Sequence, residues 1–311
     1  MIKDASILIT GANGGIGLET VKLLVKQGAG RIALACRTVE KARKAIAEIA
    51  DPGTTELEPY GGFDMNDDTS INVAVRSLPA SKPFDIVFLQ SGGMIVSQDF
   101  QFIYGAGKPI EKTIYQNVFG AYLTVKALKK EGLLAPQARI VFAGGEGARG
   151  VKGLIEKPVF RSVDEFNSYI FKGGDKYADI NALGVSKFMS ALLVQKLSLV
   201  DTEHTYVWFS PGLTAGTNGL AQVPQPKRFV MENIGFPLMQ SLGFAQGPKQ
   251  AAQKFVDCLD GQYGESGDLI GAPEGKALGA LVDQKPMNEG LTNHQFRDTF
   301  WEIVTSKCGT L

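Results

Sequence analysis

The sequence is poor in the residue types that build disulfide frameworks and metal sites. Only three cysteines, Cys36, Cys258 and Cys308, and two histidines, His204 and His294, occur in 311 residues. The cysteines are odd in number and scattered, so they form neither a disulfide framework nor a metal knuckle, and they are typical of a reducing compartment. The histidines lie far apart in the chain. We therefore expect no metal site.

An excess of one charge and long apolar runs are also missing. Lys plus Arg and Asp plus Glu both number 32, whereas a nucleic-acid surface would need a basic excess. No apolar run approaches the ~18–20 residues that span a membrane, and the first strand pattern starts too early to leave room for a signal peptide. We expect a cytoplasmic protein without a transmembrane segment that binds no nucleic acid. Formation of a homo-oligomer stays open.

Strand-like and helix-like segments alternate along the chain, which is 44% hydrophobic. This order predicts an α/β fold, a doubly wound parallel sheet (Rossmann-type), in a single domain over residues 1–311. The expected strands are 5–10, 31–36, 56–63, 85–90, 139–143, 205–209 and 268–270, and the expected helices are 15–27, 39–49, 69–78, 110–131, 181–199 and 293–306. Two irregular segments, 146–177 and 218–247, follow strands and are expected to act as lids.

A glycine-rich turn joins the first strand to the first helix. The residues that form it are Gly11, Asn13, Gly14, Gly15, Ile16 and Gly17. A helix that starts in such a turn points its free N–H groups and its positive dipole end outward, and a pyrophosphate can approach when the backbone is bare. The order of strand, turn and helix therefore predicts a nucleotide site, with a purely structural turn as the alternative.

The end of the second strand indicates which dinucleotide binds. An acidic residue at this place accepts the ribose 2′-hydroxyl, and a basic residue accommodates a 2′-phosphate. Residues 34–38 include no acid, and Arg37 offers a guanidinium suited to phosphate. We therefore expect NADP(H) rather than NAD(H). An ordinary exposed arginine is the alternative.

The spacing Thr10-Gly11-x-x-x-Gly15-x-Gly17 resembles the short-chain dehydrogenase/reductase (SDR) family. The resemblance covers about residues 5–220 and implies further cofactor contacts. Asp64 and Met65 match the pair whose carboxylate takes the adenine amino group, although Asp64 could instead cap the helix that begins near Asp67. Further residues implied to contact the cofactor are Ser91, Gly92, Pro211, Gly212, Thr214 and Thr217.

The same resemblance implies an altered catalytic centre. Asn117 matches the helix asparagine of the family's proton relay. Gly145 stands where the family has its catalytic serine, and Leu183 replaces the tyrosine of the family's Tyr-x-x-x-Lys segment. Lys187, the lysine of that segment, is retained and is implied to be a catalytic and ribose-binding residue. Tyr177 could replace the missing tyrosine only by folding back from the irregular segment.

Additional motifs resemble the protochlorophyllide reductase and retinol dehydrogenase branch of the family. They are Ala35-Cys36-Arg37, the long insert before the catalytic helix, the Pro-Gly stretch from Pro211 and the last helix around Trp301. Together these features predict an NADPH-dependent reductase that acts on a bulky apolar substrate with an atypical proton donor. Two alternatives stay open: a cofactor-binding regulatory or scaffold protein, and a non-redox enzyme that reuses the pocket.

Overall fold

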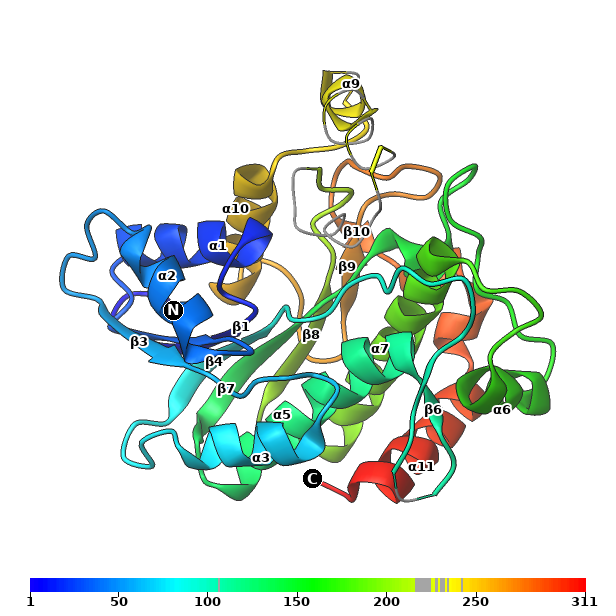
Figure 1. The fold of residues 1–311 in the computed structure, drawn as a ribbon, viewed down its shortest axis with the longest axis horizontal. Helices are drawn as coiled ribbons and strands as arrows, with labels where there is room; N and C mark the ends of the chain where they lie inside the picture. Colours follow the sequence, from blue (N-terminus) through cyan, green and yellow to red (C-terminus); the bar gives the residue numbers. More distant parts are fainter. Residues whose placement is uncertain (106, 216–224, 227–228, 230–232, 234, 242) are drawn as a thin grey trace.

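An eight-stranded sheet forms the centre of the protein, in the strand order β10-β9-β8-β7-β4-β1-β2-β3 (Figure 1). The strands are β1 Ser6–Thr10, β2 Arg31–Ala35, β3 Glu56–Tyr60, β4 Phe84–Leu89, β7 Leu134–Ala143, β8 Thr205–Phe209, β9 Leu269–Gly271 and β10 Val282–Asp283. All neighbours pair in parallel except β9 and β10. The structure, a computed structural model, describes residues 1–311 apart from 106, 216–224, 227–228, 230–232, 234 and 242.

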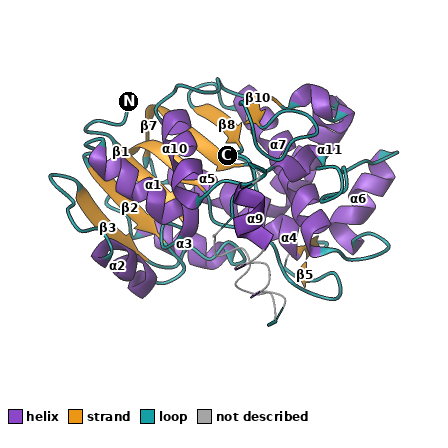
Figure 2. Ribbon diagram, turned by 90° about the horizontal axis from the view of Figure 1, so that it is seen from above, coloured by secondary structure: helices purple, strands orange, loops and turns teal. Residues whose placement is uncertain are grey.

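Helices cover both faces of the sheet, with α1, α2 and α10 on one face and α3, α5, α7 and α11 on the other (Figures 1 and 2). The helices are α1 Gly15–Lys26, α2 Val39–Ala47, α3 Asp68–Arg76, α4 Lys112–Ile114, α5 Gly120–Lys130, α6 Val163–Lys172, α7 Asp179–Val200, α9 Phe236–Ser241, α10 Pro248–Leu259 and α11 His294–Cys308. A short hairpin of β5 Phe102–Ile103 and β6 Ile110–Glu111 lies apart from the main sheet. This is the predicted doubly wound, single-domain Rossmann-type fold.

Alternating side chains of the central strands fill two separate cores. Ile7 and Ile9 of β1 join the core under α1 and α10, whereas Leu8 joins the core under α3, α5 and α7. All residues of β2 are buried, as expected for a parallel strand covered on both faces. The register pairs Thr10 with both Ala35 and Leu89, so the turns that follow β1, β2 and β4 emerge together at one edge of the sheet.

The structure corrects the sequence prediction in several connecting segments. Residues 146–177 are not irregular throughout, because they include a 3-10 turn, Glu146–Arg149, and α6. The oxygen of Ser162 accepts from the N–H of Glu165 at the start of α6, a capping pattern that was present in the sequence. The predicted helix 110–131 is interrupted by a π-helical turn, Tyr115–Phe119. Helix α10, which begins with a proline, was missed.

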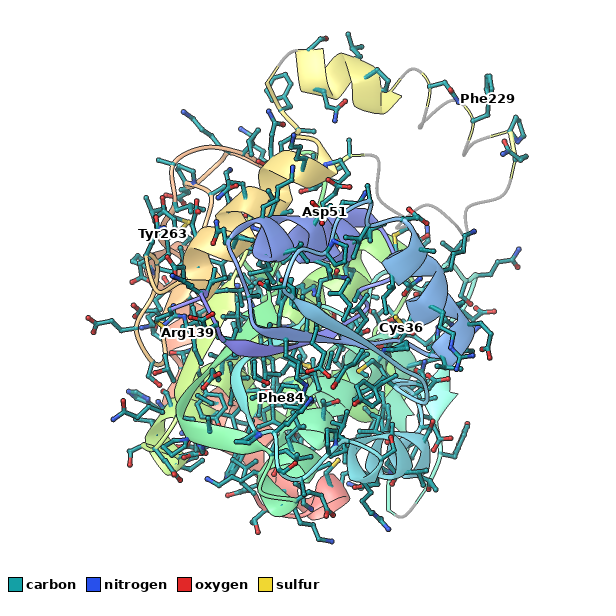
Figure 3. All side chains as sticks on the ribbon, turned by 90° about the vertical axis from the view of Figure 1, so that its left-hand side faces the viewer. Cys36, Asp51, Phe84, Arg139, Phe229 and Tyr263 are labelled. Atoms are coloured by element: carbon teal, nitrogen blue, oxygen red, sulfur yellow. The ribbon has the colours of Figure 1, made fainter. Side chains whose placement is uncertain are left out.

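The second expected lid, 218–247, lies partly outside the described residues. Its described part includes α9, and α9 and Phe229 lie away from the main body (Figure 3). Among the described residues, α7 is the one helix long and apolar enough, by length and composition, to cross a membrane. Most of its apolar window is buried inside the protein, as in a core helix.

Candidate cofactor and catalytic site

The glycine-rich turn leaves bare backbone at the start of α1. Gly11 adopts a left-handed φ of 70°, and its N–H donates to the carbonyl oxygen of Ala35 at 2.8 Å. A Cβ on Gly17 would lie 2.4 Å from the carbonyl oxygen of Gly11, so only glycine fits there. Gly14 caps α1 without a side-chain hydrogen bond, and α1, described throughout, has no acid in its first turn. The turn can therefore receive an anion at the helix N-terminus.

The end of β4 forms the floor of this turn. The hydroxyl oxygen of Thr10 accepts from the N–H groups of Gln90 and Ser91 at 3.0 and 3.1 Å. The Oε1 atom of Gln90 is buried and has no hydrogen-bond partner among the described residues, and it lies 2.5 Å from where a Cβ of Gly17 would stand. An orphaned acceptor beside bare backbone fits a hydroxyl-bearing ligand. These residues therefore fit a dinucleotide.

The residues predicted to read the adenosine end lie at the neighbouring strand ends. Arg37 is exposed, and in the described part of the chain its guanidinium has no hydrogen-bond or ion-pair partner. The Oδ1 atom of Asp64 accepts from the N–H of Asn66 at 3.0 Å. The capping alternative for Asp64 is wrong, because Asp67 caps α3. Met65 is buried and packs where a Cβ of Gly120 would clash.

Asn117 connects the π-helical turn to the loop after β4. Its Oδ1 atom accepts from the N–H of Gly93 at 2.9 Å. Its amide nitrogen donates to the carbonyl oxygens of Gly93 at 3.0 Å and Thr113 at 2.8 Å. A Cβ on Gly92 would lie 2.4 Å from Oδ1. Asn117 thus fixes the loop that contains Ser91 and Gly92.

Lys187 reaches the carboxyl end of β7. Its Nζ donates to the carbonyl oxygen of Ala143 at 2.7 Å, and burial lowers the pKa of Lys187 to about 8. Gly145 adjoins its stem, since a Cβ there would lie 3.2 Å from Cγ of Lys187. Leu183 lies one helical turn before Lys187 on the same face of α7. The positions that resemble the family's serine and tyrosine therefore flank Lys187 without a hydroxyl.

Tyr177 does fold back, but toward the loop after β4. Its hydroxyl donates to the carbonyl oxygen of Ile95, and its ring meets the ring of Phe100 edge-on, with centroids 5.0 Å apart. Burial raises the pKa of Tyr177. A buried phenol that already donates its proton to a carbonyl is a poor proton donor to a substrate. The structure thus places Tyr177 in a packing role.

The Pro-Gly stretch after β8 is held by α10. The carbonyl oxygen of Pro211 accepts from Gln246 at 2.7 Å and from Lys254 of α10 at 2.9 Å. Gly212 adopts a φ of 96°, and the hydroxyl of Thr214 donates to its carbonyl oxygen at 3.0 Å. Thr217 lies outside the described residues.

Sequence reasoning missed a buried polar network beneath this stretch. Glu146, which directly follows Gly145, accepts from the hydroxyl of Ser210 at 2.7 Å and from the N–H of Ala272 at 3.2 Å. Arg149 is buried, and its guanidinium donates to Gln284 and to several backbone carbonyls. Glu146, a charged residue directly after the glycine pair at a strand end, was the available signal. The network rigidifies the sheet edge on which the site stands.

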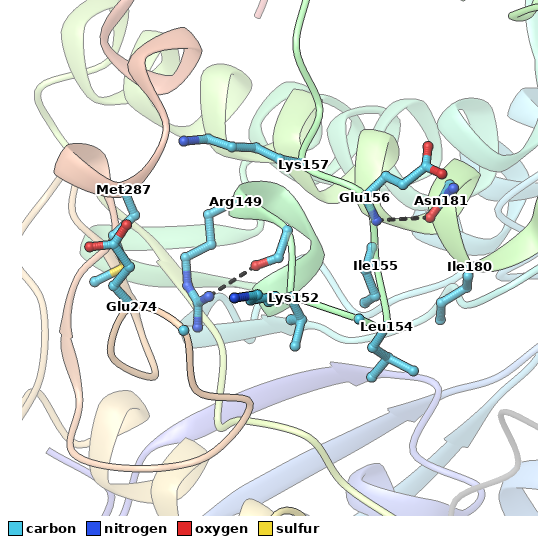
Figure 4. Close-up of a pocket in the computed structure, with 14 residues that line it drawn as sticks. Arg149, Lys152, Leu154, Ile155, Glu156, Lys157, Ile180, Asn181, Glu274 and Met287 are labelled. Carbon is cyan, nitrogen blue, oxygen red and sulfur yellow. Dashed lines mark hydrogen bonds between the residues drawn. The ribbon is translucent and has the colours of Figure 1, made fainter.

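A cavity of about 690 Å³ opens beside the first turn of α7 (Figure 4). Leu154, Ile155 and Ile180 lie on one side of it, and Glu274 and Met287 lie on the other. Ile180 precedes Leu183 and Lys187 on α7 by one and two turns. The volume lies in the range of small-molecule sites. The cavity is the candidate substrate chamber, and its lining stops short of Leu183 and Lys187.

The described residues also include one group whose ligand atoms could hold a metal ion: Asp201, Glu203 and His204. Burial alone would raise the pKa of Asp201, but hydrogen bonds from Lys129, Tyr206 and His204 hold it down to about 2. The carboxylate thus already has its partners. A structural role at the end of α7 accounts for this group.

Solved structures reproduce the whole fold. A crystal structure of an uncharacterised protein from Mycobacterium paratuberculosis aligns over 99% of this chain and 95% of its own, with a TM-score of 0.67 and 16% identity. A short-chain type dehydrogenase/reductase from Mycobacterium ulcerans aligns over 83% of both chains, with a TM-score of 0.56 and 18% identity. At these identities the likeness shows the fold alone.

Curated relatives include several dehydrogenases. Short-chain dehydrogenase/reductase prx1 of Penicillium roqueforti is 29% identical over 47% of this chain, and the match spans only 42% of the relative's length. Short chain dehydrogenase atnD of Emericella nidulans is 27% identical over 85% of this chain and 82% of its own. Retinol dehydrogenase 12 of Mus musculus is 29% identical over 62% of this chain and 55% of its own.

The sequence profile of the short chain dehydrogenases matches residues 5–156. That range runs from β1 through the glycine turn and the β7 end to the wall of the cavity. Together with the fold and the relatives, this match assigns residues 5–156 to the short-chain dehydrogenase/reductase family of nicotinamide-dependent oxidoreductases.

Proposed function

We propose that the protein is an NADPH-dependent reductase of a bulky, apolar carbonyl compound, with a proton donor other than the family's tyrosine. When bound, the reduced nicotinamide supplies a hydride with both of its electrons. The remaining work falls to the chain itself, which binds the cofactor, orients the carbonyl and supplies a proton.

The preference for NADPH rests on Arg37, the single observation that carries the cofactor assignment. Its guanidinium is exposed and unpartnered in the described ranges, and it stands at the end of β2, next to the glycine turn that would hold the pyrophosphate. No acid in residues 34–38 competes for a ribose hydroxyl. A free guanidinium at this place supports binding of a 2′-phosphate.

The substrate class rests on the cavity beside α7. Apolar side chains of Leu154, Ile155, Ile180 and Met287 line part of it, and charged side chains such as Glu274 line the rest; the apolar part suits the apolar body of a bulky compound. The retinol dehydrogenase named among the relatives is consistent with an apolar alcohol and aldehyde pair. A retinoid-sized aldehyde is therefore a suitable first substrate to test.

A second function is favoured by one specific observation: neither Leu183 nor Gly145 offers a hydroxyl beside Lys187. A chain that retains the cofactor site but lacks the usual donor could act as a cofactor-binding regulatory or scaffold protein. Such a protein would bind NADPH tightly and would turn over no carbonyl compound.

Cofactor titrations test the NADPH assignment. Loss of one charge-assisted phosphate contact costs about 1.5–3 kcal/mol, so Arg37→Ala should weaken NADPH binding roughly ten- to a hundred-fold and leave NADH binding nearly unchanged. Arg43→Ala, on the exposed side of α2, is the matched control and should change neither affinity. Equal NADPH affinity of wild type and Arg37→Ala would refute the role of Arg37.

Turnover measurements then separate the two functions. NADPH oxidation should be measured with all-trans-retinal, a long-chain aldehyde and benzaldehyde. Oxidation with the bulky aldehydes supports the reductase. Tight NADPH binding without oxidation across this panel supports the regulatory protein instead.

A further inference from the structure

We infer that Lys187 itself, and not a tyrosine hydroxyl, delivers the proton to the substrate oxygen. This inference rests on the proposed reductase function and names its missing donor. The usual position for that donor, Leu183, is apolar. The nearest phenol singled out by the sequence, Tyr177, already donates to Ile95 inside the protein. Lys187 is the proton-bearing group that remains on the catalytic face of α7.

The ammonium of Lys187 is buried, but it has hydrogen-bonding capacity to spare. It donates one N–H to the carbonyl oxygen of Ala143 at 2.7 Å, and two further N–H groups remain. It has no carboxylate partner in the described parts of the chain. Gly145 lies against the stem of Lys187, since a Cβ there would stand 3.8 Å from both Cδ and Cε. Because Gly145 has no side chain, it leaves that stem uncovered.

Charged groups on the neighbouring elements are engaged elsewhere. Glu146, at the end of β7, accepts from Ser210 and Ala272. Its carboxylate acts on Lys254 of α10 and on Arg149, opposing the effect of burial on the pKa of each. The pKa of Lys187, by contrast, is lowered by burial alone. A buried ammonium without a counter-ion holds its proton less tightly than an exposed lysine does.

The proton transfer balances within the chain and solvent. As the substrate oxygen gains negative charge, one N–H bond of the ammonium breaks and an O–H bond forms, while the N–H electron pair stays on Nζ. The neutral amine then takes a proton from water. One proton is consumed for each hydride delivered. A donor with a pKa of about 8 is well matched to this step near neutral pH.

Three variants separate proton donation from cofactor binding. Lys187→Arg keeps the positive charge but holds its protons too tightly to donate them. Lys187→Ala opens a space in which ethylammonium can replace the missing donor. Lys196→Met, on the same helix but paired with Asp298, is the control. NADPH affinity, measured by fluorescence, reports on folding and on the cofactor site independently of turnover.

The expected results are specific to a donor. With all-trans-retinal, wild-type kcat should be constant below pH 8 and fall above it. Lys187→Arg should lose about 10²–10⁴-fold in kcat, lose that pH dependence and keep NADPH affinity within tenfold. Ethylammonium should restore part of the activity of Lys187→Ala. Lysine NMR of the cofactor-free protein should show Lys187 titrating near pH 8, with the resonance assigned by its loss in Lys187→Arg.

Two distinct failures are possible. A wild type that oxidises no NADPH with any aldehyde of the panel overturns the reductase function and the donor role with it. A wild type that is active, with Lys187→Arg equally active and of the same pH profile, overturns the donor role alone. If Lys187→Arg does not fold, a wild-type kcat without a break near pH 8 overturns the donor role equally well.

Discussion

Replacing Lys187 by methionine should stabilise the folded protein at neutral pH, although it should abolish activity. Burial lowers the pKa of Lys187 from 10.5 to about 8. Each pKa unit corresponds to about 1.4 kcal/mol, so the charged form costs at most ~3 kcal/mol in the folded state. Because Lys187 as a whole residue is only half-buried, and because methionine forfeits the hydrogen bond to Ala143, we expect a net gain of roughly 1–2 kcal/mol.

The pH dependence of this gain identifies its origin. Below pH 8 the folded and unfolded states both carry the proton, and the full cost of the buried charge is present. Between about pH 8 and 10.5 the folded state releases the proton while the unfolded state retains it, so wild-type stability should rise with pH relative to the variant. The advantage of Lys187→Met should therefore shrink across this window.

Urea unfolding of the cofactor-free protein at pH 7, 9 and 10 measures both quantities. Other groups titrate in the same range, but they are common to wild type and variant, so the difference between the two curves isolates Lys187. Lys196→Met, which removes an ion pair on the same helix, should show no such convergence. A stability difference that stays constant from pH 7 to 10 would show that Lys187 is not a desolvated ammonium.

Two further predictions concern the neighbouring glycines and Leu183. The double variant Leu183→Tyr with Gly145→Ser should raise NADPH oxidation with benzaldehyde, because it restores both a positioned proton donor and its serine partner. Leu183→Tyr alone should raise it less, because the serine partner is still missing. Unchanged turnover in the double variant would contradict the alignment of these positions. Gly145 has an extended φ of 177°, so Gly145→Ser should fold normally. Gly144→Ser should lower the free energy of unfolding by about 1–3 kcal/mol, since a Cβ there would lie 2.6 Å from the ring of Trp208. Thermal melting of Gly144→Ser and Gly145→Ser side by side tests whether only the first variant is destabilised.

The sheet could be predicted from the sequence because each central strand is a continuous apolar run. Ile7, Leu8 and Ile9 are all fully buried, since helices cover both faces, and such runs alternate with helix-period segments. The glycine turn could also be predicted, because its residues act locally: Gly11 needs a left-handed backbone and Gly17 needs close approach.

The rest depends on contacts between segments distant in sequence. Nothing near Gly144 and Gly145 tells them apart, yet Gly144 is bare because Trp208 packs on it and Gly145 adjoins Lys187. Likewise, Tyr177 is ten residues from Lys187 in sequence, and its partner, Ile95, lies in a loop that sequence periodicity could not place. Whether a residue is free to react is set by such partners, and these become visible only in the folded structure.

The cost of Lys187 also bears on the choice between reductase and regulatory protein. A buried ammonium without a carboxylate partner is expensive to maintain, and methionine would fill the same space at lower cost. In a site without hydroxyls at Leu183 and Gly145, two uses can offset that cost: a contact to the bound cofactor, or donation of a proton. The first use predicts that Lys187→Arg loses NADPH affinity and turnover in parallel, whereas the second predicts a loss in kcat at nearly constant affinity. The ratio of the two losses therefore assigns the function of the lysine and of the protein together.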